Sequence, residues 1–429
     1  MGKHKRRYVT RVGEDRISNL PEHLIDSILE RVPFEDAVKT SIISKKWRYK
    51  WTSMKVLTFD NHFNAKIAKN GAIDYNEYIS TINQVLNLHK GPISKFVIHI
   101  PPMLLDSFEE IDEWMMLLSR NNATKLVLYN SNRRYELPSH VFSCLGLTEL
   151  ILENCFFSPP LQFEGFHNLE ELFLLHIDFG KSLSGNQMNL PQLKNLHFLE
   201  CTNVHNFNIK ATKMKSLILV TCPDANLLQL LENPSIVVFG VSFRTFEDFD
   251  RFEMINSISF LSSLTRIEDF LIEGNFLKFL SAEVIPKWFP LSMNSLKRLV
   301  LQDFEVGDLD QLYVALCLLR NSPNLDTLRV HFEEPRDFVF LALDHLEYPN
   351  CLDYTLKQLR TVEITCLEGL KVELLFIKLL LAHSPNLEKI SIKPIRGLNI
   401  RRRFAIAKKV MRFPRASPKA EMIYLNPEK

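Results

Sequence analysis

Two glycines, Gly180 and Gly185, have the spacing of a phosphate-binding loop, in which backbone N–H groups surround the phosphates of a nucleotide. Such a loop needs lysine and then serine or threonine after the second glycine, because the lysine compensates the phosphate charge. Asn186 and Gln187 occupy those positions. The sequence also lacks the H-E-x-x-H, G-x-S-x-G and G-x-G-x-x-G patterns of zinc proteases, hydrolases and dinucleotide-binding proteins. It therefore predicts no catalytic residue.

Cysteine and histidine side chains are the next candidates for chemistry, as metal ligands or nucleophiles. The seven cysteines are irregularly spaced and form no C-x-x-C pair, which fits neither a disulfide framework nor a zinc site. The 13 histidines are scattered, so we expect reduced thiols, no metal and no cofactor. The cysteines are Cys144, Cys155, Cys201, Cys222, Cys317, Cys351 and Cys366.

The composition is that of a folded chain without an extreme charge. With 429 residues, of which 46% are hydrophobic and 24% charged, the chain is too long for one ordinary core, so several domains or a repeat array are expected. A net charge of +2 singles out neither nucleic acid nor an acidic ligand. Residues 1–19 lack the apolar core of a secretory signal, and the longest apolar stretch, 374–382, contains Lys378 and is too short to span a membrane. We expect no membrane association and a location in the nucleus, the cytoplasm or both.

A leucine-rich pattern repeats along most of the chain. It first reads Leu147-x-x-Leu150-x-Leu152-x-x-Cys155, and units 20–29 residues apart are typical of leucine-rich repeats. Further units have second positions at Leu172, Leu196, Leu217, Leu299, Leu328, Val362 and Ile390. Strands are expected at 55–60, 95–100 and 125–129, and helices at 75–88, 109–120, 309–320 and 372–383. The register of residues 235–274 is not assigned by this pattern.

The alternation within each repeat separates buried residues from surface residues. Leucines of the pattern point into the solenoid, and the residues between them point out of the concave sheet. Cys155, Cys201 and Cys222 fall at the turn after the strand, where a packing role is expected. Apolar side chains on the outward face indicate a binding surface, unless loops cover them or they pack against their neighbours. The candidate target-binding residues are Ile151, Phe173, Leu175, His197, Leu199, Ile218, Arg298 and Arg329.

The N-terminal segment predicts two short helices that need a partner. Leu24, Ile25, Ile28 and Leu29 form one apolar stripe after Leu20-Pro21, and Pro33 ends that helix at Val32. A second helix is expected from Glu35. About forty residues are too few for an independent core, so either a partner surface or the following chain must cover the stripe.

The order of residues in this segment resembles the F-box motif. The match covers L-P-E-H-L-I-D-S-I-L-E-R-V-P at 20–33 and A-V-K-T-S-I-I-S-K-K-W-R at 37–48. The resemblance implies binding to a Skp-type adaptor and, through it, to a cullin scaffold. The residues that match the adaptor-binding and core positions of the family are Leu20, Pro21, Leu24, Ile28, Leu29, Val32, Val38, Ile43 and Trp47.

Beyond the F-box, the chain resembles plant F-box proteins with leucine-rich repeats and a C-terminal FBD region. The FBD likeness lies in L-K-Q-L-R-T-V-E-I through S-P-N-L-E-K-I-S-I at 356–392, and in F-P-R-A-S-P-K-A near the end. We therefore predict an α/β fold, in which a short all-helical F-box precedes a leucine-rich-repeat solenoid with a curved parallel sheet and helices or loops on its convex side. The predicted divisions are a basic flexible tail at 1–14, the F-box at 15–54, the solenoid at 55–355, FBD-like terminal repeats at 356–395 and a basic segment at 396–429.

The expected function follows from this resemblance: a substrate-recognition subunit of an SCF-type ubiquitin ligase, without chemistry of its own, that binds an unknown target protein through its repeats. The alternative is a leucine-rich-repeat scaffold that does not lead to degradation. Some similar plant proteins hold small-molecule hormones inside the solenoid, but no residue pattern here indicates such a pocket.

Basic residues cluster at both ends of the chain. Residues 3–7 form a short basic run, and residues 393–419 contain ten Lys or Arg and no acid. Such runs occur in nuclear-import signals and phosphate-binding patches. No interleaved aromatic pattern accompanies them, so nucleic acid is not the expected partner and a solvated surface explains them more simply. Ile406, Val410 and Phe413 indicate a final helix that packs on the solenoid.

Overall fold

The computed structural model describes residues 17, 20–102, 107–180, 187–222, 224–243, 260, 262–282, 292–333, 342–343, 346–347 and 354–426. The chain divides into two compact units, Met1–Leu150 and Ile151–Lys429. The predicted tail at 1–14 and Cys351 lie outside the described residues. The predicted limit between F-box and repeats, after residue 54, does not separate two compact units.

The first unit begins with the helices α1 (Glu22–Leu29) and α2 (Phe34–Lys39). Pro21 is the N-cap of α1, and the helix ends at Leu29, earlier than the predicted Val32, with Glu30 as C-cap. The residue before a proline is disfavoured in helical geometry, so the chain leaves the helix ahead of Pro33. Pro33 in turn is the N-cap of α2, which starts one residue before the predicted Glu35.

Three parallel strands follow in the first unit, and their register is continuous. Val56 lies opposite Lys95, which lies opposite Lys125. Helices connect the strands as the sequence predicts, and the ranges predicted for α4, α5 and β2 are confirmed. The elements after α2 are the 3-10 turns Thr40–Ile42 and Lys50–Ser53, β1 (Val56–Phe59), α3 (Asn61–Ile67), α4 (Tyr75–Leu88), β2 (Lys95–Ile100), α5 (Glu109–Arg120), β3 (Lys125–Asn130), β4 (Tyr135–Glu136) and α6 (Ser139–Phe142).

The N-terminal helices share their core with the first strand. The buried ring of Phe34 packs edge-on against Trp51 and Phe59, at centroid distances of 5.9 and 5.5 Å. On the surface, Lys66 of α3 pairs with Glu35 of α2 at 3.0 Å. A segment of this length cannot bury its own apolar faces, so it uses the adjoining repeat as its second wall.

The second unit is built on one long run of parallel strands. Leu172, Leu196 and Leu217 lie in register across three successive strands, and the same row continues through Phe239, Phe270 and Leu299. All six are buried, as the leucine pattern predicts for the four leucines. The strands of this run are β5 (Glu149–Glu153), β7 (Glu171–Leu175), β9 (Asn195–Leu199), β11 (Ser216–Val220), β12 (Val238–Ser242), β13 (Asp269–Glu273), β14 (Arg298–Phe304), β15 (Thr327–Phe332), β16 (Thr361–Leu367), β17 (Lys389–Pro394) and β18 (Glu421–Tyr424). Three two-residue strands lie outside it: β6 (Cys155–Phe156), β8 (Met188–Asn189) and β10 (Ile209–Lys210), the last two paired with each other.

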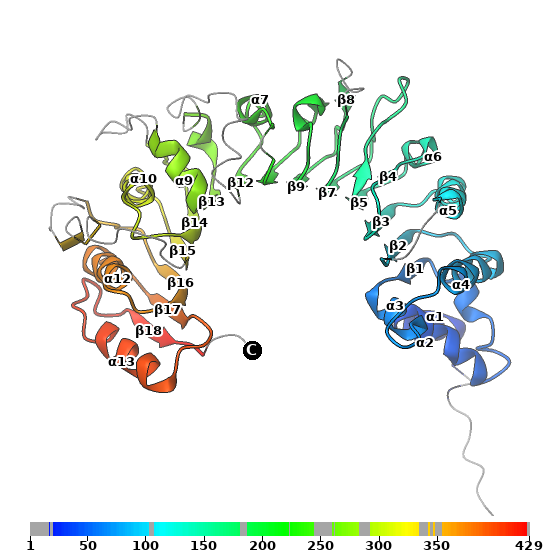
Figure 1. Cartoon of the computed structure of the whole chain (residues 1–429), viewed down its shortest axis with the longest axis horizontal. Coiled ribbons are helices and arrows are strands. Elements are labelled where there is room, and N and C mark those ends of the chain that lie inside the picture. Colours follow the sequence, from blue (N-terminus) through cyan, green and yellow to red (C-terminus); the bar gives the residue numbers. More distant parts are fainter. Residues whose placement is uncertain are drawn as a thin grey trace, which may run out of the picture. The chain divides into compact units, whose positions relative to one another are not determined.

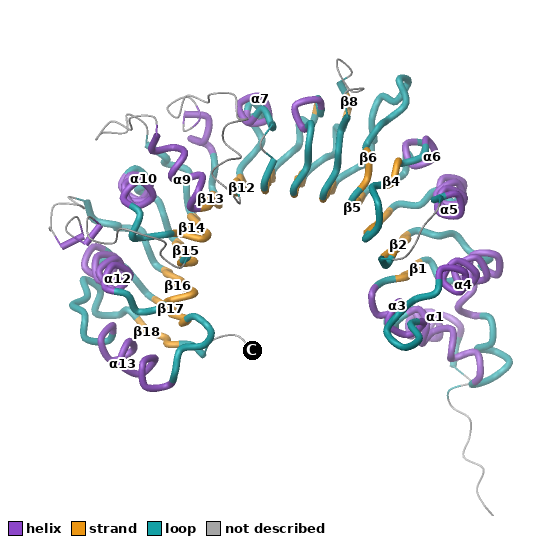
Figure 2. Tube along the Cα trace, in the orientation of Figure 1, coloured by secondary structure: helices purple, strands orange, loops and turns teal. Residues whose placement is uncertain are grey.

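Helices cover one side of this sheet, as Figure 1 shows for α9, α10 and α12. Figure 2 shows the same separation, with strands on one side and helices and loops on the other. We call the side opposite the helices the open face. The helices are α7 (Leu227–Leu231), α9 (Gly274–Ala282), α10 (Leu309–Arg320), α12 (Lys371–His383) and α13 (Ile400–Val410), with 3-10 turns at Val204–Asn206 and Leu264–Arg266. The helix predicted at 309–320 is confirmed, and α12 starts one residue before its predicted range.

Residues 235–274, whose register the leucine pattern left unassigned, contain two strands with the usual repeat spacing. Strands β12 and β13 pair in parallel, with Phe239 opposite Phe270. Their sequences, Ile236-x-x-Phe239-x-Val241 and Ile267-x-x-Phe270-x-Ile272, keep the spacing with other apolar residues in place of leucine. These side chains are buried like the leucines elsewhere.

The C-terminal segment is more structured than predicted. It holds α13 and the strand β18, which pairs in parallel with β17 and extends the sheet. Ile406 and Val410 are buried, as expected for a packed helix. The helix ends at Val410, so Phe413 lies beyond it, half-buried.

The cysteines after the strands have the predicted packing role. Cys155, Cys201 and Cys222 are fully buried. Sγ of Cys155 donates to the Glu153 carbonyl and Sγ of Cys201 to the Leu174 carbonyl, each at 3.2 Å. Burial raises the pKa of the Cys222 thiol, which disfavours the reactive thiolate.

Candidate docking surfaces

An apolar patch lies on the N-terminal helices. Leu24 and Ile28 are one turn apart on α1, and each remains about two-fifths exposed, at 42% and 41%. Their neighbours Ile25 and Leu29 lie on the adjacent side of the helix and are buried. The helix therefore has one broad apolar stripe, of which the chain itself covers only one edge.

Further exposed apolar side chains lie on the turn after α2 and ahead of α1. Ile42 is 89% exposed and Ile43 46%, and Ile17, ahead of α1, is 54% exposed. Ile17 and Ile42 were not among the predicted site residues. The signal for Ile42 was present in the sequence, as an Ile-Ile pair between serines where one helical face cannot bury both residues.

The nine predicted F-box residues divide into three groups by burial. Pro21, Leu24, Ile28 and Ile43 are exposed, whereas Leu20, Val32 and Val38 are half-buried. Leu29 and Trp47 are buried in the core of the unit, so in this structure they support the surface without forming it. Nε1 of Trp47 donates to the Ile17 carbonyl at 3.2 Å, which positions the chain ahead of α1.

Charged residues connect the edges of the apolar patch. Lys50 pairs with Glu22 at the start of α1 at 3.0 Å, and this contact lowers the pKa of the Glu22 carboxyl. Lys46 donates from Nζ to the Leu20 carbonyl. The Lys50–Glu22 pair holds the second 3-10 turn against the start of α1.

The open face of the second unit carries a row of apolar side chains. Phe173, His197 and Ile218 lie opposite one another on β7, β9 and β11. The rings of Phe173 and His197 are 4.4 Å apart, and burial lowers the pKa of His197, which favours its neutral form. Leu271 on β13 and Val300 on β14 continue the row beyond Gly240 of β12.

Gly240 interrupts the row of apolar side chains and is itself buried. A Cβ at this position would lie 3.4 Å from the side chain of Ile218 and 3.6 Å from that of Leu271. These two apolar side chains therefore close over the glycine from both sides.

The structure places the predicted target-binding residues on the open face, but it does not leave the apolar ones fully exposed. Ile151, Phe173, Leu175, Leu199 and Ile218 are half-buried. Adjacent strands lie about 4.8 Å apart, so each side chain covers the flank of the next.

The two arginines predicted for target binding are paired within the chain. Arg298 meets Asp269 at 3.1 Å, and Arg329 meets Glu363 at 2.8 Å. Both arginines remain exposed. Surface pairs of this kind contribute about 0–1 kcal/mol and open readily, so these arginines stay accessible to a partner.

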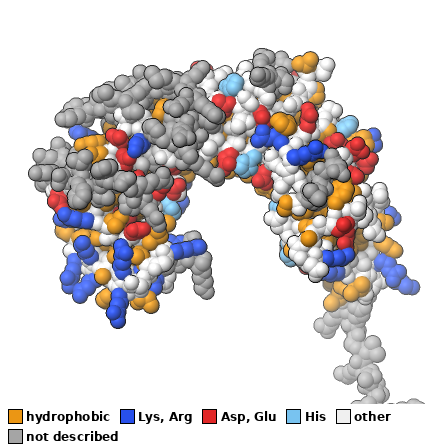
Figure 3. Space-filling view, viewed as in Figure 1, with side chains coloured by type: hydrophobic (Ala, Val, Ile, Leu, Met, Phe, Trp, Pro, Cys, Tyr) orange, Lys and Arg blue, Asp and Glu red, His pale blue; other side chains and the backbone are white. Residues whose placement is uncertain are grey.

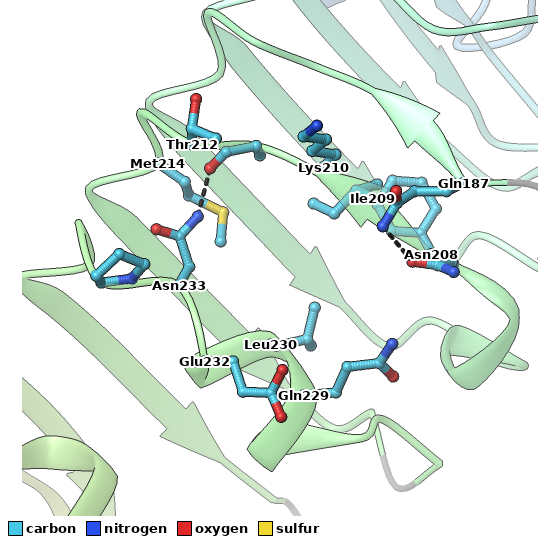
Figure 4. A pocket seen from close by; sticks show the side chains of 13 residues that line it. Gln187, Asn208, Ile209, Lys210, Thr212, Met214, Gln229, Leu230, Glu232 and Asn233 are labelled. Carbon is cyan, nitrogen blue, oxygen red and sulfur yellow. Dashed lines mark hydrogen bonds between the residues drawn. The ribbon is translucent and has the colours of Figure 1, made fainter.

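A pocket of about 320 Å³ lies in the second unit between the β10 segment and α7 (Figure 4). Its wall combines apolar residues such as Met214 and Leu230 with amides. Asn233 donates to the Ala211 carbonyl, and Gln187 donates to Asn208 at 3.4 Å, so amide groups are partly satisfied within the chain. The residues that line it include no histidine or cysteine; its only ionisable side chains are Lys210 and Glu232.

Two buried carboxyl groups have strongly shifted acidities. Burial raises the pKa of Glu273 and of Glu373 to about 7. Each accepts backbone N–H bonds: Glu273 from Phe243 at 3.1 Å, and Glu373 from Gly369 and Leu370 at 2.7 Å. Shifted acids often mark active sites, but these two close the loops that lead from a strand into a helix.

The described part of the chain has neither a candidate metal site nor a candidate membrane span. It contains no group of three or more His, Cys, Asp or Glu side chains arranged to hold a metal ion. None of its helices has the length and apolar character to cross a bilayer.

Known protein families match the N-terminal helical segment and a large part of the repeats. Residues 17–59 match the F-box domain, and residues 111–330 match the family described as FBD-associated F-box protein At5g56370, LRR repeats. The F-box/FBD/LRR-repeat protein At1g13570 of Arabidopsis thaliana is 32% identical over 96% of this chain and 98% of its own length. The putative FBD-associated F-box protein At5g56440 of the same plant is 23% identical over 90% of this chain and 94% of its own.

Proposed function

Because this chain belongs to the F-box/FBD/LRR-repeat family, we propose that it is the substrate-recognition subunit of an SCF-type ubiquitin ligase. In this role the F-box binds a Skp-type adaptor, and the adaptor links it to a cullin scaffold. The open face of the repeats binds a target protein. The chain contributes no chemistry and raises the rate by holding the target near the conjugating enzyme.

The uncovered apolar face of α1 is the observation that supports this proposal most strongly. Leu24 and Ile28 stay exposed while Ile25 and Leu29 are buried, although all four have similar apolar side chains. Apolar patches that a folded chain leaves uncovered usually mark an interaction site. Their position within the region that matches the F-box domain supports a Skp-type adaptor as the partner class.

A pull-down with a purified Skp-type adaptor tests the docking step. Leu24→Asp/Ile28→Asp places charges on the exposed face and should abolish binding, because an unpaired carboxylate would be buried in the complex. The chain should stay folded, since both side chains are outside the core. Leu161→Asp, at an exposed apolar residue in the second unit, is the matched control and should bind normally. Adaptor binding that survives the double change would contradict the proposed surface.

A scaffold that binds the adaptor without causing degradation is the alternative function. Both functions share the adaptor contact, so binding alone does not separate them. Levels of a captured target in cells that express wild type or Leu24→Asp/Ile28→Asp separate the two. A ligase subunit predicts that the target accumulates with the double variant, whereas a scaffold predicts unchanged target levels.

A further inference from the structure

The helix α13 combines exposed apolar side chains with a high positive charge. Ile400, Phe404 and Met411 are 75%, 70% and 52% exposed. At 100° per residue they fall within a narrow stripe on one side of the helix. Among the other described residues of the second unit, Leu161 is the one large apolar side chain that is at least as exposed as Met411.

Cations lie next to this stripe. By the same geometry, Arg401, Lys408 and Arg412 project together beside the apolar stripe. None of them has an acidic partner within the described chain. Figure 3 shows Lys and Arg side chains gathered with hydrophobic ones around this C-terminal part of the unit.

The buried side of α13 fixes the orientation of the exposed side. Ile406 packs over the turn at Gly369, where an added Cβ would overlap its side chain, and Val410 is 1% exposed. Asn399 caps the helix by accepting from the Arg402 N–H at 2.8 Å. The apolar stripe therefore cannot rotate inward.

The charge distribution is unfavourable for the helix itself. Arg401, Arg402 and Arg403 occupy the first turn, where the helix dipole is positive and acidic residues are preferred. The helix has no acid to compensate them. Three arginines at a helix N-terminus go against this preference and do not stabilise the helix, which indicates that they serve binding.

We propose that α13 is a peripheral membrane contact that lies on an anionic phospholipid surface. Ile400, Phe404 and Met411 enter the boundary between headgroups and acyl chains, while Arg401, Lys408 and Arg412 contact lipid phosphates. Helices with cations beside an apolar stripe lie in this way at membrane interfaces. This contact differs from spanning a membrane, and it revises the expectation from the sequence that the chain has no membrane contact.

Nucleic acid and protein partners explain fewer of the features of α13 than a membrane does. A nucleic acid would use the cations and leave Ile400 and Met411 in water. A stable protein partner usually buries about 800 Å² on each side, from 20–30 residues, whereas α13 has 11. A membrane sets no such minimum, because each cation and each inserted side chain adds its own contribution.

Vesicle flotation with the full chain tests the proposal. Vesicles of phosphatidylcholine with 30% phosphatidylserine should bind the wild type at least tenfold more tightly than pure phosphatidylcholine. Ile400→Ser/Phe404→Ser should weaken binding roughly tenfold through lost insertion. The triple change Arg401→Gln/Lys408→Gln/Arg412→Gln should weaken it roughly a hundredfold.

Matched control variants show whether weaker vesicle binding comes from α13 itself or from any loss of an exposed apolar side chain or of positive charge. Leu161→Ser removes an apolar side chain that is 80% exposed, and Lys213→Gln/Lys215→Gln/Lys357→Gln removes three exposed cations elsewhere in the same unit. Both should bind like the wild type. The apolar F-box patch is the same in every variant, so its contribution to vesicle binding cancels.

Insertion is measured directly with Phe404→Trp and brominated lipids. Quenching of the added tryptophan fluorescence by shallow bromine labels supports the proposal. Three results would overturn it: no preference for anionic vesicles, binding that Ile400→Ser/Phe404→Ser leaves unchanged, or tighter binding to duplex RNA than to anionic vesicles. The last result would assign the cations to nucleic acid. None of these results depends on whether the F-box binds an adaptor.

Discussion

The ring of Phe34 in α2 lies edge-on to the ring of Phe59 in β1, with their centroids 5.5 Å apart. Both rings are buried, and Trp51 packs against the other side of Phe34. One aromatic side chain thus joins the F-box helices to the first repeat strand. The docking surface depends on this junction, because α1 and α2 have no separate core.

Replacing Phe34 by alanine should therefore destabilise the whole first unit. The loss of a buried aromatic ring typically costs about 3–5 kcal/mol in the free energy of unfolding. Urea denaturation monitored by tryptophan fluorescence measures this change. Ile42→Ala, at a residue that is 89% exposed, should change the free energy of unfolding by less than about 0.5 kcal/mol. Equal effects of the two changes would show that the shared core is not what stabilises the F-box.

Glu373→Gln should change how stability depends on pH. Burial raises the pKa of Glu373 to about 7 in the folded chain, above its ordinary value near 4.5. The folded chain thus keeps a proton that the unfolded chain releases, so this contribution to stability is complete below about pH 4.5 and is lost as the pH rises to 7. The loss amounts to about 3 kcal/mol at most.

The difference in the free energy of unfolding between the wild type and Glu373→Gln separates the titration of Glu373 from that of other groups. Thermal or urea unfolding between pH 4.5 and 8 should show the wild type losing stability relative to Glu373→Gln as the pH rises. Glutamine can still accept the N–H groups of Gly369 and Leu370. Glu421→Gln, at an exposed residue, should leave the pH profile unchanged. A constant difference between wild type and Glu373→Gln at all pH values would contradict a raised pKa.

Gly369→Ala should destabilise the end of the second unit through its contact with α13. Gly369 has a φ of +84°, which side chains rarely adopt, and an added Cβ would overlap Ile406. Together the strain and the overlap should cost about 1–3 kcal/mol in the free energy of unfolding.

A second substitution separates the backbone strain at residue 369 from the overlap with Ile406. In the Gly369→Ala background, Ile406→Ala removes the overlap but not the backbone strain, so it should cost less there than in the wild type. A double-mutant cycle from urea denaturation gives the coupling. Additive effects would mean that α13 does not pack on this turn.

Phe173→Asp/Leu199→Asp should abolish target capture and leave adaptor binding intact. Both residues are half-buried on the open face of the second unit, whereas the adaptor surface belongs to the first. The measurement is parallel co-precipitation of adaptor and target from cells. Lys213→Asp, on an exposed turn outside the strands, is the control. Target capture that persists in the double variant would place the target elsewhere.

Much of the fold follows from spacing alone. Leu172, Leu196 and Leu217 recur at a repeat distance within the L-x-x-L-x-L spacing, so their burial needs no long-range information. The repeat strands β12 and β13 were missed because Phe239 and Phe270 replace leucine, although a hydrophobic rather than a leucine pattern would find them. The strand β18 was missed because Glu421–Tyr424 is too short to signal a repeat without its partner β17.

The sequence by itself determined that an F-box precedes leucine-rich repeats, because the residue order at 20–48 resembles the F-box motif and the leucines recur at a repeat spacing. It did not distinguish Leu24 from Ile25, or Ile28 from Leu29, since all four suit either face of an amphipathic helix. Only the tertiary structure decided between them, because Phe34, Trp51 and β1 form a wall on one side of the N-terminal helices. In the same way, Ile400 and Ile406 are equally apolar, and only the packing of α13 over Gly369 buries one and exposes the other.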